Sequence, residues 1–286
     1  MNLAILLVFA APVALAAIGE VVGQKAGVIN IGLEGMMLLG AFFGMLSAYQ
    51  TGSPALGLGA GVLSGVVAAA VSGWFTIKLA TDQVVAGTAI NLFAVGLTGS
   101  LFRTRFGSSG QLLSLPKLTQ FLGIDPVIVF MLLSIPAAWY LLAKTGWGLA
   151  VRSAGEYPKA TEAAGCSVAG LRLQAALIGG AFAGLAGAYL SIGVAGSFAE
   201  NMTNGRGFIA IAMVTFGRWR PLLVFLAALL IGFFDSLQYL FQAIGVNVPS
   251  QLLLALPYVV ALLVLVIVGK GTAAPASLGV PYRRDT

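Results

Sequence analysis

Long apolar stretches alternate with short polar segments through nearly all of the 286-residue chain. A helix needs about 20 mostly apolar residues to cross the hydrocarbon core of a bilayer. The pattern therefore predicts an all-α, polytopic membrane helical bundle with about nine transmembrane segments, in a range of eight to ten. The nine predicted segments are 2–19, 31–49, 55–77, 83–102, 126–143, 171–195, 207–217, 221–243 and 251–269.

Two places depart from this regular alternation. Segment 207–217 is short for a complete crossing, so a loop that dips into the membrane would have to complete it. The Gly-rich stretch 19–35 (GEVVGQKAGVINIGLEG) is compatible with a cytoplasmic turn and with a helix break inside the protein. Non-helical backbone is tolerated at membrane depth only where protein or a cavity covers it.

Glycines recur four residues apart on three of the predicted segments. Small residues at this spacing allow helix backbones to approach closely in lipid. The pattern predicts close helix packing rather than a phosphate-binding loop at Gly40 and Gly44, Gly57, Gly61 and Gly65, and Gly180 and Gly184.

The composition excludes several classes of protein. The chain is 59% hydrophobic and 8% charged, with a mean hydropathy of +1.00, whereas a soluble domain carries about 25% charged residues. There is no His and a single Cys, Cys166, so the usual general base, the usual metal ligand and an internal disulfide are all missing. We therefore expect no enzyme activity, no catalytic residues and no metal site.

The positions of Lys and Arg predict the orientation, because these residues gather on the cytoplasmic side. With the C-terminus inside, eleven of the 15 Lys and Arg residues lie in cytoplasmic segments and four lie outside. The sequence thus predicts the N-terminus out and the C-terminus in. Residues 1–270 form one transmembrane domain, and residues 271–286 are expected to be a disordered cytoplasmic tail.

Polar residues inside the predicted spans are candidates for the substrate pathway, because ionisable groups are costly there. Asp235, whose expected partners are polar groups in the outer half of the membrane or Arg206, either lines a pathway or makes a structural bond between helices. For Asn91 the structural role is favoured, because amides often bridge helices. The predicted pathway residues are Glu34, Asn91 and Asp235 within the spans, Asn30 just before the second span, and the aromatic Phe208, which could stack on a ligand.

The segment 152–172 (RSAGEYPKATEAAGCSVAGLR) is polar and is predicted to lie inside. Pro158 suits the first position of a helix, and Gly165 suits the residue just past its end. A helix of about two turns is marginal in isolation, and the alanines between these two residues give it a small-residue face. We therefore expect the helix to dock on a partner, although an inert connector between spans is the alternative.

At this point the chain resembles a known family. GEYPKATEAAG (155–165) resembles the cytoplasmic coupling motif of ABC importer permeases, closest to the branch of branched-chain amino acid, ribose and nucleoside permeases. GVINIGLEGMMLLGAFFG (27–44) resembles the entry to the second span of nucleoside-type members. GRGFIAIAMVTFGRWRP (205–221) resembles the short late helix of that branch. The resemblance covers nearly the whole chain.

The resemblance implies a multi-pass permease subunit in the cell membrane (inner membrane) of a prokaryote. It implies a second permease subunit, identical or homologous, two ATPase subunits that bind ATP and Mg inside, and an external substrate-binding protein, often a lipoprotein. No cofactor is expected on this chain and no nucleic-acid partner. The expected ATPase-coupling residues, combining the resemblance with the predicted helix, are Gly155, Glu156, Pro158, Ala160, Ala163, Ala164 and Gly165.

Several functions stay open at this level. The chain lacks a complete G-x-x-x-x-G-K-[ST] loop, because Val264 stands where the first Gly of the Gly269-Lys270 motif would be needed. A separate ATPase is therefore expected to drive a pathway for nucleosides or a related small polar solute. The alternatives are a permease for simple sugars or branched-chain amino acids, and a stand-alone transporter that uses Asp235 or Glu34 for ion coupling.

Overall fold

A computed structural model of the chain describes residues 3–107, 115–116, 118, 125–243, 255, 257–260, 262–263, 266 and 274–282. All regular secondary structure in these ranges is helical, which confirms the all-α prediction for them. The elements are α1 Leu3–Lys25, α2 Leu33–Thr51, α3 Pro54–Gly73, η1 Trp74–Lys78, α4 Gln83–Phe106, α5 Pro126–Lys144, α6 Gly146–Glu156, α7 Pro158–Ala163, α8 Val168–Tyr189, η2 Leu190–Ala195, α9 Arg206–Phe216 and α10 Pro221–Ala243.

Six helices in the described part of the chain are long and apolar enough to cross a membrane, judged by length and composition. They are Leu3–Lys25, Pro54–Lys78, Gln83–Phe106, Pro126–Lys144, Val168–Ala195 and Pro221–Gln238. The structure therefore confirms a polytopic bundle, while the count of nine spans and the orientation stay predictions.

The other three predicted spans have different outcomes. Segment 31–49 corresponds to α2, which has 19 residues but is not among the six. Segment 207–217 corresponds to α9, which at 11 residues is as short as the sequence predicts. The predicted span 251–269 lies mostly outside the described residues.

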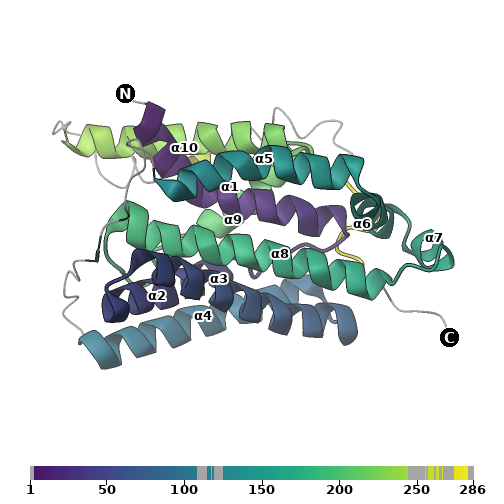
Figure 1. Ribbon diagram of the computed structural model, residues 1–286, viewed down its shortest axis with the longest axis horizontal. Coiled ribbons are helices and arrows are strands. Elements are labelled where there is room, and N and C mark those ends of the chain that lie inside the picture. The colour runs from purple at the N-terminus through teal and green to yellow at the C-terminus, as the bar shows by residue number, and fades with distance from the viewer. Residues whose placement is uncertain are drawn as a thin grey trace.

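The helices run roughly along one axis, with α8 through the middle of the molecule (Figure 1). Helices α2, α3 and α4 lie on one side of α8, and α1, α5 and α10 lie on the other (Figure 1). The short helices α6 and α7 project from one end of the long axis, and α1 begins at the opposite end (Figure 1). Helix α9 contacts α1, α2 and α10.

The closest packing joins α2, α3 and α8 and depends on glycine, as the sequence predicts. A Cβ on Gly65 would lie 2.1 Å from the carbonyl oxygen of Gly180, and a Cβ on Gly40 would lie 2.3 Å from that of Gly184. A Cβ on Gly184 would lie 2.2 Å from the carbonyl oxygen of Gly61. Helix backbones touch directly at these points, so side chains larger than hydrogen would force the helices apart.

Residues 274–282, which belong to the segment expected to be a disordered tail, bond to two distant parts of the chain. The Ser277 N–H donates to the Gly155 carbonyl at 2.8 Å, and the Gly279 N–H donates to the Gly27 carbonyl at 3.1 Å. The segment has no apolar periodicity, so the sequence carries no local signal of order. Its order comes from bonds to backbone groups that are distant in the chain.

We predict that a single methyl group at the α2–α3–α8 contact destabilises the protein. Gly184→Ala should lower the apparent melting temperature in detergent, since overpacking a tight contact costs about 1–3 kcal/mol. The matched control is Gly59→Ala on α3, where an added Cβ meets nothing within 4 Å. The control should gain about 0.5–1 kcal/mol from the better helix propensity of Ala. Equal melting temperatures for the two variants would contradict the packing role.

Candidate functional site

The connection between α1 and α2 folds back into the protein. The chain turns at Gly27, whose φ is +89°, and runs without helical structure through 28–32. The Asn30 N–H then donates to Glu20 Oε1 at 3.1 Å, although Glu20 lies more than a turn before the end of α1. Most of residues 26–32 are buried, so the Gly-rich stretch contains a helix break that packs within the protein.

Helix α4 supplies hydrogen-bonding partners to this broken backbone. The Ile29 N–H donates to Gln83 Oε1 at 2.7 Å. Asn91 bonds on both sides of the break: its Nδ2 donates to the Ile31 carbonyl at 2.9 Å, and its Oδ1 accepts from the Gly35 N–H at 2.8 Å. An unpaired backbone group is costly away from water, so Asn91 has the structural role favoured by the sequence.

Glu34, in the first turn of α2, caps the N-terminus of α9. Its two carboxylate oxygens accept from the Gly205 N–H at 2.8 Å and the Gly207 N–H at 2.6 Å. The first N–H groups of a helix have no partner within the helix and carry partial positive charge, which favours a carboxylate there. Glu34 is only 6% exposed, so two interrupted helices begin at one buried point.

Asp235 lies beside this junction. The Arg206 guanidinium, at the start of α9, approaches Asp235 Oδ2 at 3.4 Å, with the two side chains 19% and 10% exposed. Of the partners expected from the sequence, Arg206 is therefore the one that the structure shows. The pair borders a cavity of about 20 Å³, which holds no more than a water-sized molecule. The Tyr258 hydroxyl, at the same cavity, donates to the Asn204 carbonyl.

The remaining two predicted pathway residues have different surroundings. Asn30 is buried at 8% exposure, and its Nδ2 donates to the Met36 sulfur at 3.1 Å. Phe208, on α9, is 48% exposed. The structure thus gathers Asn30, Glu34 and Asn91 around the break and leaves Phe208 on the surface.

A polar network that was not predicted from the sequence lies at the end of α1, just before the break. The Gln24 Nε2 donates to Glu20 Oε1 at 3.0 Å, and the Trp219 indole N–H donates to Gln24 Oε1 at 2.8 Å. The predicted span ended at residue 19, whereas α1 continues to Lys25 and buries Glu20 completely. The spacing of Glu20 and Gln24, four apart on one helix face, was the available signal.

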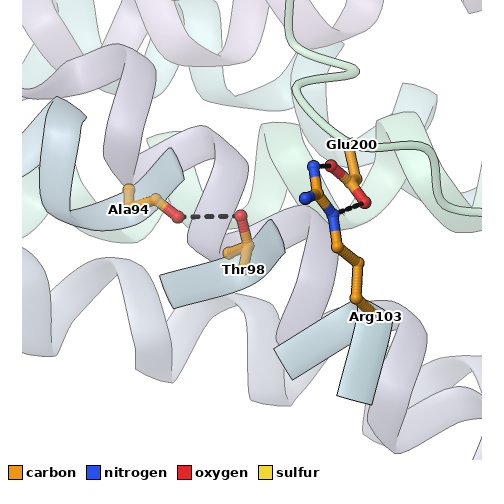
Figure 2. A network of polar contacts seen from close by, with 4 residues as sticks. All are labelled: Ala94, Thr98, Arg103 and Glu200. Carbon is orange, nitrogen blue, oxygen red and sulfur yellow. Dashed lines mark hydrogen bonds and ion pairs between the residues drawn. The ribbon is translucent and has the colours of Figure 1, made fainter. Parts of the chain in front are cut away.

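An ion pair at the far end of α4 holds the segment before α9. Figure 2 shows Arg103 with its guanidinium against the Glu200 carboxylate, one turn beyond Thr98, which bonds to the Ala94 carbonyl within the helix. The two bonds measure 2.8 and 2.6 Å, and they lower the pKa of the Glu200 carboxyl. The pair is solvent-exposed, so it orients the segment more than it stabilises the fold.

A larger, apolar groove of about 690 Å³ lies between α2, α3 and α4. Leu39, Phe43, Val67 and Phe93 are among its lining residues. None of the five predicted pathway residues lines it. Apolar side chains facing outward in a membrane protein ordinarily meet lipid, so we assign this groove no role in the site.

The predicted docking helix, placed within about 155–165, corresponds to α7. Helix α6 ends at Glu156, and α7 covers Pro158–Ala163. Pro158 occupies the first position of α7, and Gly165 follows its end with a φ of +80°, as predicted. The expected small-residue face is exposed; it consists of Ala160, Ala163 and Ala164.

Two of the predicted coupling residues also make contacts inside this chain. A Cβ on Gly155 would lie 2.2 Å from the Lys25 carbonyl oxygen, so its glycine permits close contact between α6 and the end of α1. Glu156 is exposed, and its Oε2 accepts from the Ala276 N–H at 3.2 Å. Packing of α6 thus accounts for Gly155 in the structure.

Comparison with known proteins gives a match along most of the chain. The family described as "Branched-chain amino acid transport system / permease component" matches residues 2–269. The chain is 33% identical to the guanosine ABC transporter permease protein NupQ of Bacillus subtilis, over 96% of this chain and 94% of that protein. It is also 33% identical to the nucleoside ABC transporter permease protein NupC of Lactococcus lactis, over 97% and 95%.

A sugar-transport protein is similar at the same level. The Haloferax volcanii protein TsgC13, assigned by its name to glucose ABC transport as a permease, is 36% identical over 81% of this chain and 74% of its own length. No solved structure gives a significant match to the chain.

We predict that the break before α2 depends on the Asn91 amide. Asn91→Leu leaves the Ile31 carbonyl and the Gly35 N–H without partners, and each unsatisfied buried group costs about 1–3 kcal/mol. The apparent melting temperature in detergent should fall clearly. Thr88→Val, on the same helix, is the matched control, because the Thr88 hydroxyl is exposed and bonds to the carbonyl of Val84 in its own helix. A control that melts as low as Asn91→Leu would contradict the specific role of Asn91.

Proposed function

This chain belongs to the family of branched-chain amino acid transport system permease components, and we propose that it forms the pathway by which a nucleoside crosses the membrane in an ABC importer. The family consists of transport components rather than enzymes, and the chain is a multi-pass protein of the cell membrane. The observation that carries the proposal is similarity along nearly the whole length to two permeases named for guanosine and nucleosides.

A simple sugar is the second candidate substrate. It is favoured by the 36% identity to a permease assigned by name to glucose transport. The match to that permease covers 81% of this chain, whereas the matches to the two nucleoside permeases cover 96% and 97%. For this reason we place a nucleoside or a related small polar solute first.

The proposed importer has further subunits. Because this chain has no complete phosphate-binding loop, ATP and Mg would bind to separate ATPase subunits on the cytoplasmic side. A second permease subunit, the same chain or a homologue, would complete the pathway. An external substrate-binding protein, often a lipoprotein, would deliver the solute.

We propose that α7 is the docking site for the ATPase subunit. It projects from one end of the bundle beside α6 (Figure 1), and its exposed alanines leave room for a groove on the partner to close around it. A helix of six residues has little stability of its own, so a partner surface that holds it is physically reasonable. Pro158 and Gly165 set its two ends, and Glu156 lies exposed just before it.

The site around the break is proposed to line or gate the pathway. A carboxylate that caps α9 from α2 joins two interrupted helices at one point. Relative movement of these two helices would break or remake both bonds together. ATP binding that pulls the docking helices of two permease subunits together would shift the balance between such arrangements.

We predict that a bulky residue on the exposed face of α7 blocks transport without unfolding the chain. Ala163→Phe should reduce ATP-dependent uptake of guanosine at least about tenfold in vesicles that contain the ATPase subunits and the binding protein, a loss of about 1.4 kcal/mol or more in coupling. Ala169→Phe, at another exposed alanine, in the first turn of α8, is the control and should retain uptake. Full uptake with Ala163→Phe would contradict docking at α7. Uptake driven by an ion gradient without ATPase subunits would instead support a stand-alone transporter.

The single cysteine provides a test of orientation. Cys166 is exposed and lies close after α7, on the side that we propose to be cytoplasmic. A membrane-impermeant maleimide should label it in inverted vesicles and not in intact cells. Cys166→Ser gives the background. Labelling in intact cells would place α7 outside and overturn both the orientation and the proposed docking.

A further inference from the structure

Residues 274–282, here called the C-terminal strap, contact both the α1–α2 connection and residues 155–165, here called the docking segment, which comprise the end of α6 and all of α7. No transport role described above uses them. The strap has no helix or strand of its own, and its Leu278 and Tyr282 side chains pack against the buried core. Because the strap has no regular secondary structure, its position depends on its contacts with the rest of the chain. The parts of the chain that it contacts therefore indicate its role.

On one side the strap bonds to the docking segment three times. The Ser277 N–H donates to the Gly155 carbonyl at 2.8 Å. The Ala276 N–H donates to Glu156 Oε2 at 3.2 Å, and the Tyr282 hydroxyl donates to the Glu162 carboxylate. The bonds therefore reach from the last turn of α6 into α7.

On the other side the strap bonds to the beginning of the helix break. The Gly279 N–H donates to the Gly27 carbonyl at 3.1 Å, and Gly279 has a φ of +77°, a conformation that favours glycine. Arg172, at the start of α8, is 3% exposed and bonds to both the strap and the α1–α2 connection. Its Nη1 donates to the Val280 carbonyl at 2.8 Å and its Nε to the Ala26 carbonyl at 3.2 Å.

From this junction a chain of bonds continues to the candidate site. Residues 28–32 follow Gly27 directly and are held by Glu20, Gln83 and Asn91. Glu34 then bonds to the beginning of α9. The described contacts thus run without interruption from α7, through the strap and the α1–α2 connection, to the point where α2 and α9 begin.

We propose that the C-terminal strap is a coupling element, which makes the docking segment and the α1–α2 connection move as one body. A push on α7 would then displace residues 26–32 and, through Glu34, the start of α9. Arg172 and Tyr282 are its positioning residues. The proposal rests on the proposed function, because it needs an ATPase subunit that acts on α7.

A pair of truncations in the full complex tests the strap. One chain ends at Ala273 and lacks the strap, and the matched control ends at Tyr282 and lacks only residues 283–286. Both are assembled with the ATPase subunits and the binding protein in vesicles, and guanosine uptake and ATP hydrolysis are measured together. We expect both chains to retain the ATPase subunits and basal hydrolysis, and the chain without the strap to transport at least about fivefold less guanosine per ATP. An unchanged ratio, or loss of the ATPase subunits from the shorter chain, would overturn the proposal.

A point variant and a second readout guard against misfolding of the shorter chain. Tyr282→Phe removes one hydroxyl that bonds to α7, and Tyr140→Phe, at an exposed position on α5, is its control. Hydrogen exchange of amides 26–32 is compared with and without ATP in each complex. The change on ATP binding should be at least about twofold smaller in Tyr282→Phe than in Tyr140→Phe. Equal changes would overturn the strap proposal even if guanosine is not the substrate, whereas a chain that pairs with no ATPase subunit would overturn the proposed function and the strap with it.

Discussion

Backbone groups that leave a helix inside an apolar protein must find partners within that protein, and this constraint organises the structure around residues 26–32. Glu20 on α1, Gln83 and Asn91 on α4, and Arg172 on α8 each hold part of this segment. Four polar side chains from three helices are thereby fixed in position. These hydrogen bonds therefore constrain how α1, α4 and α8 are placed around the start of α2.

The same constraint explains why α2 and α9 meet. Each begins in the interior, so each presents N–H groups that its own helix cannot satisfy. Glu34, in the first turn of α2, accepts hydrogen bonds from two N–H groups at the start of α9. Asn91 accepts such a bond from the Gly35 N–H of α2. Glycine contacts bring the backbones of α2, α3 and α8 directly together, so α2 enters this junction from a tightly packed group of helices.

The two ends of the molecule's long axis expose different features. The α7 end carries an accessible alanine face and the bonds of the C-terminal strap, whereas the far end of α4 carries the exposed Arg103–Glu200 pair (Figure 2). The bonds described above link the α7 end to the start of α9 by way of the strap and the α1–α2 connection.

The sequence alone determined the class of protein, the position of most helices, the glycine contacts and the ends of α7. These features depend on composition, on periodicity and on residues such as Pro158 and Gly165 that act on their own backbone, so neighbouring residues are enough to specify them. Only the tertiary structure decided that the Gly-rich stretch folds inward, that α1 continues far enough to bury Glu20, and that residues 274–282 are held in place. The bonds responsible join residues 54 to 60 positions apart at α4 and 108 or more positions apart at the strap. A local sequence pattern does not predict which distant group will bond to a given N–H or carbonyl, because this pairing is determined only when the helices pack.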